Sequence, residues 1–268
     1  MRIIELKDDA SRELLREMQA KLAVGAGATT PDAGGKTVEI FGEALSPQAV
    51  TARIIEDVRR EGDAAVFRYT RAFDGFALSA TNLRVSAEEV AEARQSVSAA
   101  FVRAAEAAIA NVRRFQESIL VKTPAELTAG GRRLGVRYVP VRRVGVHVPG
   151  FSAPLPSSVI MNCVPAQVAG VEEIAVATPP QTSGKVAPET LACCHLLGIT
   201  EIYRAAGVQA IAALVIGTRL MPKVDMIVGP GRMETQLAKK LLVGEAAIDL
   251  LAGPSEVLVL ADDTARAE

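Results

Sequence analysis

Hydrophobic residues in the first 120 positions recur every three or four residues, which is the period of a helix packed on one side. In residues 2–22 this spacing predicts an N-terminal helical arm. The arm is followed by Val24–Lys36, a stretch composed mostly of Gly, Ala, Thr and Pro. Because such small residues bury little surface, this stretch is predicted to be a linker.

Polar residues mark where the next helices begin. Ser46 is followed by a proline, and this pair predicts a helix start because serine caps free N–H groups and proline lacks one. That helix is predicted to end at Gly62. Ser86 and Glu89 form a capping box, which predicts the start of one long Ala-rich helix, Ala87–Leu120. The first 120 residues are therefore predicted to be mostly helical.

After about residue 138 the pattern changes to short apolar runs that alternate with helical segments, and Gly or Pro ends several of the runs. This alternation is typical of an α/β fold, a doubly wound parallel sheet with helices on both faces. The predicted strands are centred near Val146, Ala175, Tyr203, Ile227 and Leu258. The predicted helices between them are Ser157–Ala169, Val186–Leu197, Ala210–Gly217 and Thr235–Leu242.

The last predicted strand, residues 256–263, is strongly apolar, and such a strand is expected to have helices on both faces. Only Thr264–Glu268 follow it. We therefore expect a chain that is cut inside a domain.

Composition limits the classes of partner. The 30 basic and 31 acidic residues give a formal net charge of −1, so no overall field attracts nucleic acid or an anionic membrane. The N-terminus lacks the apolar core of a signal peptide, and no apolar run approaches the roughly 18 residues of a membrane span. A soluble cytoplasmic protein is expected, without a nucleic acid or membrane partner. Basic pairs such as Lys239 and Lys240 are predicted to be solvated.

Residue chemistry alone predicts a binding surface without a complete catalytic set. Neither a G-x-G-x-x-G motif nor a Walker A motif is present. The turn Gly229–Gly231 follows a predicted strand and precedes a helix, so it either contacts a ligand or serves turn geometry alone. His147 and His195 are the two histidines, and they show no zinc-binding pattern. The three cysteines, which lack Cys-x-x-Cys spacing, are predicted to be buried and free.

Several segments resemble one enzyme family. They read RVGVHVPGFSAPLPSSVIMNCVPAQVAGVEEI, IYRAAGVQAIAALVIGT, PKVDMIVGPG and AKKLLVGEAAIDLLAGPSEVLVLADDTA, in that order. The helical segment VRREGDAAVFRYTRAFDG fits as well. Together they identify the chain as similar to the histidinol dehydrogenases, with LAGPSEVLVLAD and AGVQAIAAL as the most specific words.

The resemblance implies an enzyme that requires NAD and zinc and oxidises L-histidinol to L-histidine through an aldehyde. It also implies a homodimer, and a Rossmann-like domain of incomplete type inserted into another α/β domain. On this chain the implied parts are an N-terminal arm (1–23), a first α/β domain (24–143 plus 248–268) and an NAD-binding domain (144–247).

The resemblance also assigns roles to individual residues. The NAD contacts of the family fall at His147, Gln209 and Arg232, where the first and last positions are typically Tyr and Asn. Ser255 matches a residue that contacts the substrate. The zinc ligands and the catalytic Glu-His pair of the family match no position here, so we expect residues 1–268 alone to be inactive.

Two alternatives remain open at this point. The chain could be a truncated homologue that binds a nucleotide or a partner protein without catalysis. It could also be an unrelated NAD enzyme that shares the fold, because fold alone does not define function.

Overall fold

The computed structural model describes residues 9–22, 33–150, 153–252 and 264. The first six helices are α1 (Asp9–Leu22), α2 (Ala33–Phe41), α3 (Pro47–Glu61), α4 (Asp63–Asp74), α5 (Ala87–Ser96) and α6 (Ala99–Ile119). Four more follow among the strands: α7 (Pro156–Ala169), α8 (Pro188–Leu196), α9 (Gly207–Ile216) and α10 (Met233–Leu242). The strands are β1 (Leu127–Ala129), β2 (Arg132–Leu134), β3 (Arg143–His147), β4 (Glu173–Ala177), β5 (Glu201–Tyr203), β6 (Met226–Val228) and β7 (Ala247–Ile248).

The predicted α/β class is confirmed by a parallel sheet of five strands in the order β5-β4-β3-β6-β7. The predicted strands near Val146, Ala175, Tyr203 and Ile227 are β3 to β6. The strand predicted near Leu258 lies outside the described residues. The two-residue strand β7, which pairs with β6, was not predicted.

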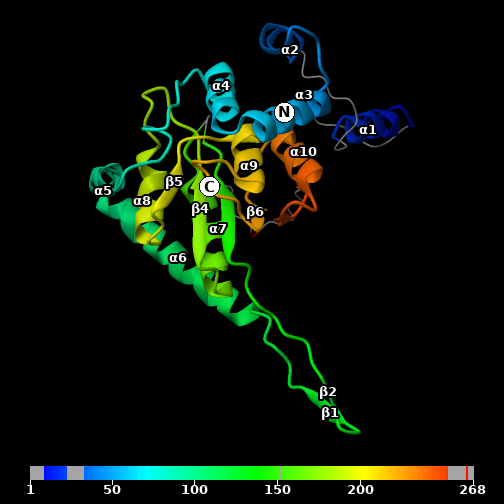
Figure 1. The fold of residues 1–268 in the computed structure, drawn as a ribbon, viewed down its shortest axis with the longest axis vertical. Coiled ribbons are helices and arrows are strands. Elements are labelled where there is room, and N and C mark those ends of the chain that lie inside the picture. Colours follow the sequence, from blue (N-terminus) through cyan, green and yellow to red (C-terminus); the bar gives the residue numbers. More distant parts are fainter. Residues whose placement is uncertain (1–8, 23–32, 151–152, 253–263, 265–268) are drawn as a thin grey trace.

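Both faces of the sheet are covered by helices, as Figure 1 shows. On one face α9 and α10 pack with α3 and α4, and on the other α7 and α8 pack with α5 and α6. Alternate strand residues supply the two cores: Ala175 and Ala177 join the first, and Val176 between them joins the second. Each core combines residues of the sheet with residues of the N-terminal helices. The predicted boundary between two domains at residue 143 stays a prediction.

Two predictions about the N-terminal helices are wrong. The predicted long helix Ala87–Leu120 is two helices, α5 and α6, because Ser98 adopts extended backbone and its hydroxyl caps the N–H of Phe101 at 3.1 Å. The predicted linker ends too late, since α2 already begins at Ala33. Its remaining residues, 24–32, lie outside the described residues, as do residues 2–8 of the predicted arm helix.

A β-hairpin that was not predicted lies at the end of a long arm between α6 and β3 (Figure 1). Strands β1 and β2 pair antiparallel through Gly130 and Gly131, whose positive φ angles of 57° and 74° suit a two-residue hairpin turn. The paired Leu127 and Leu134 are each 63% exposed. The arm therefore presents apolar side chains to solvent.

No helix in the described part of the chain combines the length and the apolar character needed to cross a membrane.

Candidate functional site

The strand order identifies where a ligand would bind. From β3 the chain runs outward through β4 to β5, and it then returns to pair β6 with the other side of β3. Ligands of doubly wound sheets bind at such a reversal, outside the carboxyl ends of the two strands. In this protein β3 ends at His147 and β6 leads into Gly229–Gly231. The histidine and the turn therefore lie together at the reversal.

His147 joins the turns that surround this point. The side chain is buried, and its Nδ1 lies 2.8 Å from the carbonyl oxygen of Pro230. Its Nε2 accepts the backbone N–H of Gly207 at 3.1 Å, at the start of α9. Because Pro230 O can only accept and Gly207 N can only donate, the ring is neutral with its proton on Nδ1. Burial lowers the pKa of His147 to about 4, and the nearby Lys239 charge acts in the same direction.

The Gly-Pro-Gly turn is held by an ion pair between the buried Lys239 and the partly exposed Asp249 side chain. Lys239 of α10 has a side chain that is 1% exposed, and its Nζ donates to the Gly229 carbonyl oxygen and, at 2.7 Å, to Asp249 Oδ1. Asp249, directly after β7, accepts the Gly229 N–H at 2.9 Å through Oδ2. Gly229 has a φ of 113°, and a Cβ there would collide with the His147 carbonyl oxygen. The N–H and the carbonyl oxygen of Gly229 are thus both fixed by the ion pair of Lys239 and Asp249.

The prediction that Lys239 and Lys240 are both solvated is wrong for Lys239. Lys240 is exposed, whereas its neighbour faces the sheet and finds a carboxylate there. On the same helix, the Gln236 Oε1 accepts the Ala252 N–H at 3.0 Å, so α10 also holds the segment after β7. The buried Gln236 Nε2 has no hydrogen-bond partner within the described structure.

The N-termini of α9 and α10 face the same edge of the sheet. α9 starts after Ala206 and α10 starts after Arg232, and neither of these two residues caps its helix with a side chain. Of the N–H groups of α9, that of Gly207 is bonded to His147. Gln209, in the first turn of α9, is buried, and Arg232 is exposed. Uncapped N–H groups and a helix dipole favour an anionic group at this edge.

The remaining predicted features lie elsewhere. Ser255 is outside the described residues. Within the described ranges no group of three or more His, Cys, Asp and Glu side chains could hold a metal ion, so no zinc ligand is assigned. His195 is exposed on α8. The three cysteines are free and buried, as predicted, and burial raises the pKa of Cys163 to about 12 and that of Cys193 to about 11.

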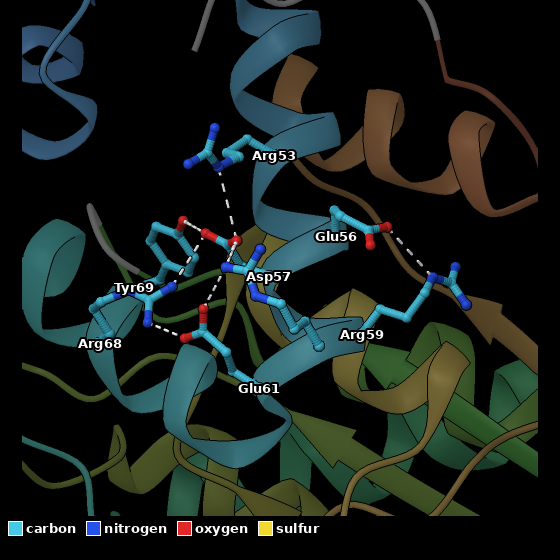
Figure 2. Close-up of polar contacts among 8 residues, drawn as sticks. Arg53, Glu56, Asp57, Arg59, Glu61, Arg68 and Tyr69 are labelled. Carbon is cyan, nitrogen blue, oxygen red and sulfur yellow. Dashed lines mark hydrogen bonds and ion pairs between the residues drawn. The ribbon is translucent and has the colours of Figure 1, made fainter.

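A second polar cluster lies at the junction of α3 and α4, around Asp57 (Figure 2). The Asp57 carboxylate accepts the Tyr69 hydroxyl at 2.5 Å and the guanidinium groups of Arg60 at 2.6 Å and Arg68 at 3.1 Å. Arg60 and Arg68 also pair with Glu61, and their hydrogen bonds lower the pKa of that carboxyl to about 2.

This cluster lines a pocket of about 490 Å³ that includes Arg53 and, from α2, Glu39. Its arginines, at positions 53, 60 and 68, are matched by the acidic residues 39, 57 and 61. Since the charges cancel, the pocket has no excess positive potential for an anionic ligand. The cluster fastens α3 to α4.

The site residues that sequence reasoning missed are Lys239 and Asp249. Lys239 lies in a helix that was predicted nearly correctly, whereas Asp249 follows β7, a strand that was not predicted. A hydrophobic environment around Lys239, in the run QLAKKLL, was the available signal. It did not distinguish which lysine of the pair faces the sheet.

The strand order, the Gly-Pro-Gly turn and the uncapped helices define the class of this protein: a Rossmann-like α/β protein with a candidate ligand site at the strand-order reversal. Comparison with known proteins narrows the class. A family model described as histidinol dehydrogenase matches residues 43–268. The chain therefore belongs to the histidinol dehydrogenase family.

Individual relatives agree. The chain is 41% identical over 267 residues to a histidinol dehydrogenase of Rhodopirellula baltica, covering 98% of this chain and 58% of the relative. It is 47% identical over 219 residues to one of a Synechococcus species, covering 82% and 50%. The crystal structure of histidinol dehydrogenase from Elizabethkingia anophelis matches with a TM-score of 0.77 and 39% identity, covering 84% of this chain and 52% of that one. The chain spans about half the length of the curated relatives that it matches.

Proposed function

We propose that this chain is the NAD-binding part of a histidinol dehydrogenase, with the dinucleotide at the reversal between β3 and β6. The observation that carries the proposal is the meeting of Gly229–Gly231 and the uncapped start of α9 at the carboxyl ends of these strands. The family membership supports a dehydrogenase role.

In this proposal the turns at the carboxyl ends of the strands bind different parts of NAD. The backbone N–H groups at the start of α9 and the Gly-Pro-Gly turn receive the pyrophosphate. Gln209 hydrogen-bonds the cofactor, and the exposed Arg232 adds a cation beside its phosphates. His147, predicted to contact NAD, has both ring nitrogens engaged by Pro230 and Gly207. His147 therefore supports NAD binding indirectly, because it holds the Gly-Pro-Gly turn and the start of α9 together.

The proposed reaction oxidises L-histidinol to histidinal and then, as its hydrate, to L-histidine. When bound, NAD would supply the acceptor for the C–H hydride in each step, and a base would take the O–H proton. The family resemblance assigns that base and the zinc ligands to residues without a match in this chain. No chemical step is therefore derived from the described residues, and residues 1–268 alone are proposed to bind NAD without turning over histidinol.

The family match extends beyond the sheet into the N-terminal helices, from residue 43. It gives no support to an unrelated enzyme that shares the fold, and nothing favours a separate non-catalytic binding module.

We also propose that the protein forms a homodimer. The arm between α6 and β3 supports this, since its exposed apolar residues, among them Leu127, Leu134 and Val139, suit contact with another protein surface.

Titration calorimetry of the chain with NAD at millimolar concentration tests the cofactor assignment. Saturable heat is expected. Gln209→Met should raise the dissociation constant by about tenfold, because one buried hydrogen bond is lost. Gln95→Met, at an exposed position of α5, is the matched control and should leave it unchanged. No heat with the unchanged chain would refute the cofactor assignment, and equal binding by Gln209→Met would refute the role of Gln209.

A further inference from the structure

A buried lysine on a helix that packs against a parallel sheet is an uncommon feature. Lys239 sits on the inner face of α10, beside buried Ala238 and Leu242. Removing an ammonium group from water costs several kcal/mol, and apolar residues of similar volume often stabilise a core as well as a buried ion pair does. Core stability alone therefore gives no reason for a lysine here.

The contacts of the pair point to a different task. Asp249 accepts hydrogen bonds from Lys239, from the Gly229 N–H and, at 2.7 Å, from the Leu250 N–H. Lys239 closes the ring by donating to the Gly229 carbonyl oxygen. Both polar atoms of one glycine, the residue that opens the Gly-Pro-Gly turn, are thereby tied to charged groups, and such hydrogen bonds are about twice as strong as neutral ones.

The ring of hydrogen bonds among Lys239, Asp249 and Gly229 is connected to the other turns at this edge of the sheet. The carbonyl oxygen of Pro230, next to Gly229, accepts a hydrogen bond from His147 Nδ1–H, and Nε2 of the same imidazole accepts the Gly207 N–H at the start of α9. A displacement of Gly229 would therefore move Pro230 and change the position of His147 relative to α9. The ion pair of Lys239 and Asp249 therefore sets the spacing of the two turns.

We infer that Lys239 and Asp249 are positioning residues of the cofactor site: their ion pair fixes the Gly229–Gly231 turn relative to the start of α9 and so sets the affinity for the dinucleotide. The inference rests on the proposed function for its ligand. Asp249 also begins the segment whose Ala252 is held by Gln236 of α10. The same helix thus fixes both the turn and the segment that leads toward Ser255.

The test compares Lys239→Met with Lys240→Met, which is the same substitution one residue along the same helix at an exposed position. Asp249→Asn is a second variant, because an amide cannot accept all of the hydrogen bonds that the carboxylate accepts. NAD affinity is measured by calorimetry well below each variant's unfolding midpoint. A loss of about tenfold is expected in Lys239→Met and in Asp249→Asn, and no change in Lys240→Met.

A second readout separates positioning from simple loss of stability. The chain has two histidines, so ¹⁵N-histidine NMR resolves His147 from His195. In the unchanged chain His147 should show the single neutral form protonated on Nδ1. Lys239→Met and Asp249→Asn should shift the His147 nitrogen signals, and Lys240→Met should not.

The outcomes are distinct. If the unchanged chain does not bind NAD, the proposed function fails and this inference fails with it. If the unchanged chain binds NAD and Lys239→Met, correctly folded by circular dichroism, binds equally well, the inference alone is overturned. Unmoved His147 signals in both pair variants would also overturn it.

Discussion

His147 and Asp74 are two partly or fully buried groups whose pKa values are shifted in opposite ways. Burial lowers the pKa of His147 to about 4 from the ordinary 6.5 and raises that of Asp74 to about 7 from 3.8. Asp74 Oδ2 has no hydrogen-bond partner among the described residues, which fits a carboxyl that is neutral when buried. Each group therefore makes the free energy of unfolding depend on pH.

The two groups change the free energy of unfolding with pH in opposite directions. Between pH 4 and 6.5 the unfolded chain holds a proton on His147 that the folded chain lacks, so this group's stabilisation is lost on acidification, by about 3 kcal/mol in full. Between pH 3.8 and 7 the folded chain holds a proton on Asp74 that the unfolded chain lacks, so stability decreases as pH rises. In the unchanged chain the two effects offset each other.

Urea unfolding between pH 4 and 7 should separate them. Relative to the unchanged chain, Asp74→Asn should lose more stability on acidification, and His147→Gln should lose less, because each removes one of the opposing terms. His195→Gln, at an exposed site, should follow the unchanged chain. Three parallel pH profiles would show that neither buried group titrates as described.

Single residues were predictable where their chemistry is local. The free buried cysteines and the serine caps of α3 and α5 follow from neighbours within a few positions, and Ser46 and Ser86 cap as expected, at 3.2 Å each. Glu89 was expected to complete a capping box, yet its carboxylate instead pairs at 2.7 Å with Arg204, the residue directly after β5. A partner 115 residues away leaves no local signal in the sequence.

At the scale of elements, a buried arginine joins the amino ends of the central strands. Arg143, the first residue of β3, donates to Glu173 of β4 at 2.6 Å and to Glu201 of β5. Its side chain is 9% exposed. This cluster lies at the edge of the sheet opposite the candidate cofactor site, because all of these strands are parallel.

Removal of Arg143 should therefore affect stability and leave cofactor binding intact. Arg143→Met is expected to lower the free energy of unfolding by about 2 kcal/mol, the range of hydrogen bonds to charged groups. Arg142→Met is the control, because Arg142 contacts the same Glu173 from a side chain that is 75% exposed. Urea unfolding measures both, and calorimetry with NAD should give unchanged affinity. Equal stability of the two variants would contradict this role for Arg143.

The central elements were predictable because their signals are strong and continuous. Strands β3 to β6 are apolar runs that end in Gly or Pro, and α9 is apolar on all sides because it is buried. The short strands were missed for the opposite reason: β1 and β2 are exposed, and β7 exists through its pairing with β6. The break between α5 and α6 has a local signal in Ser98, a capping residue, but the Ala-rich sequence on both sides of it favours one continuous helix.

At the scale of the whole molecule, the arm is the feature that the fold itself does not explain. It extends away from the body (Figure 1), and its apolar residues Leu127, Leu134 and Val139 are exposed. A monomer rarely exposes a contiguous apolar surface of this kind without a binding partner. In the proposed dimer, the second copy would cover the Leu127 and Leu134 face.

Successive strand residues point to opposite faces, so Leu127 and Thr128 provide a matched test of that face. Leu127→Glu should weaken self-association by about tenfold or more, because a charge would be buried at the contact. Thr128→Glu adds the same charge one residue along and should leave it unchanged. Light scattering coupled to size-exclusion chromatography measures the mass of each over a dilution series. A monomeric unchanged chain, or a dimer that Leu127→Glu does not weaken, would contradict the proposed contact. If only Leu127→Glu dissociates, the Leu127 face of the hairpin is the surface that joins the two copies.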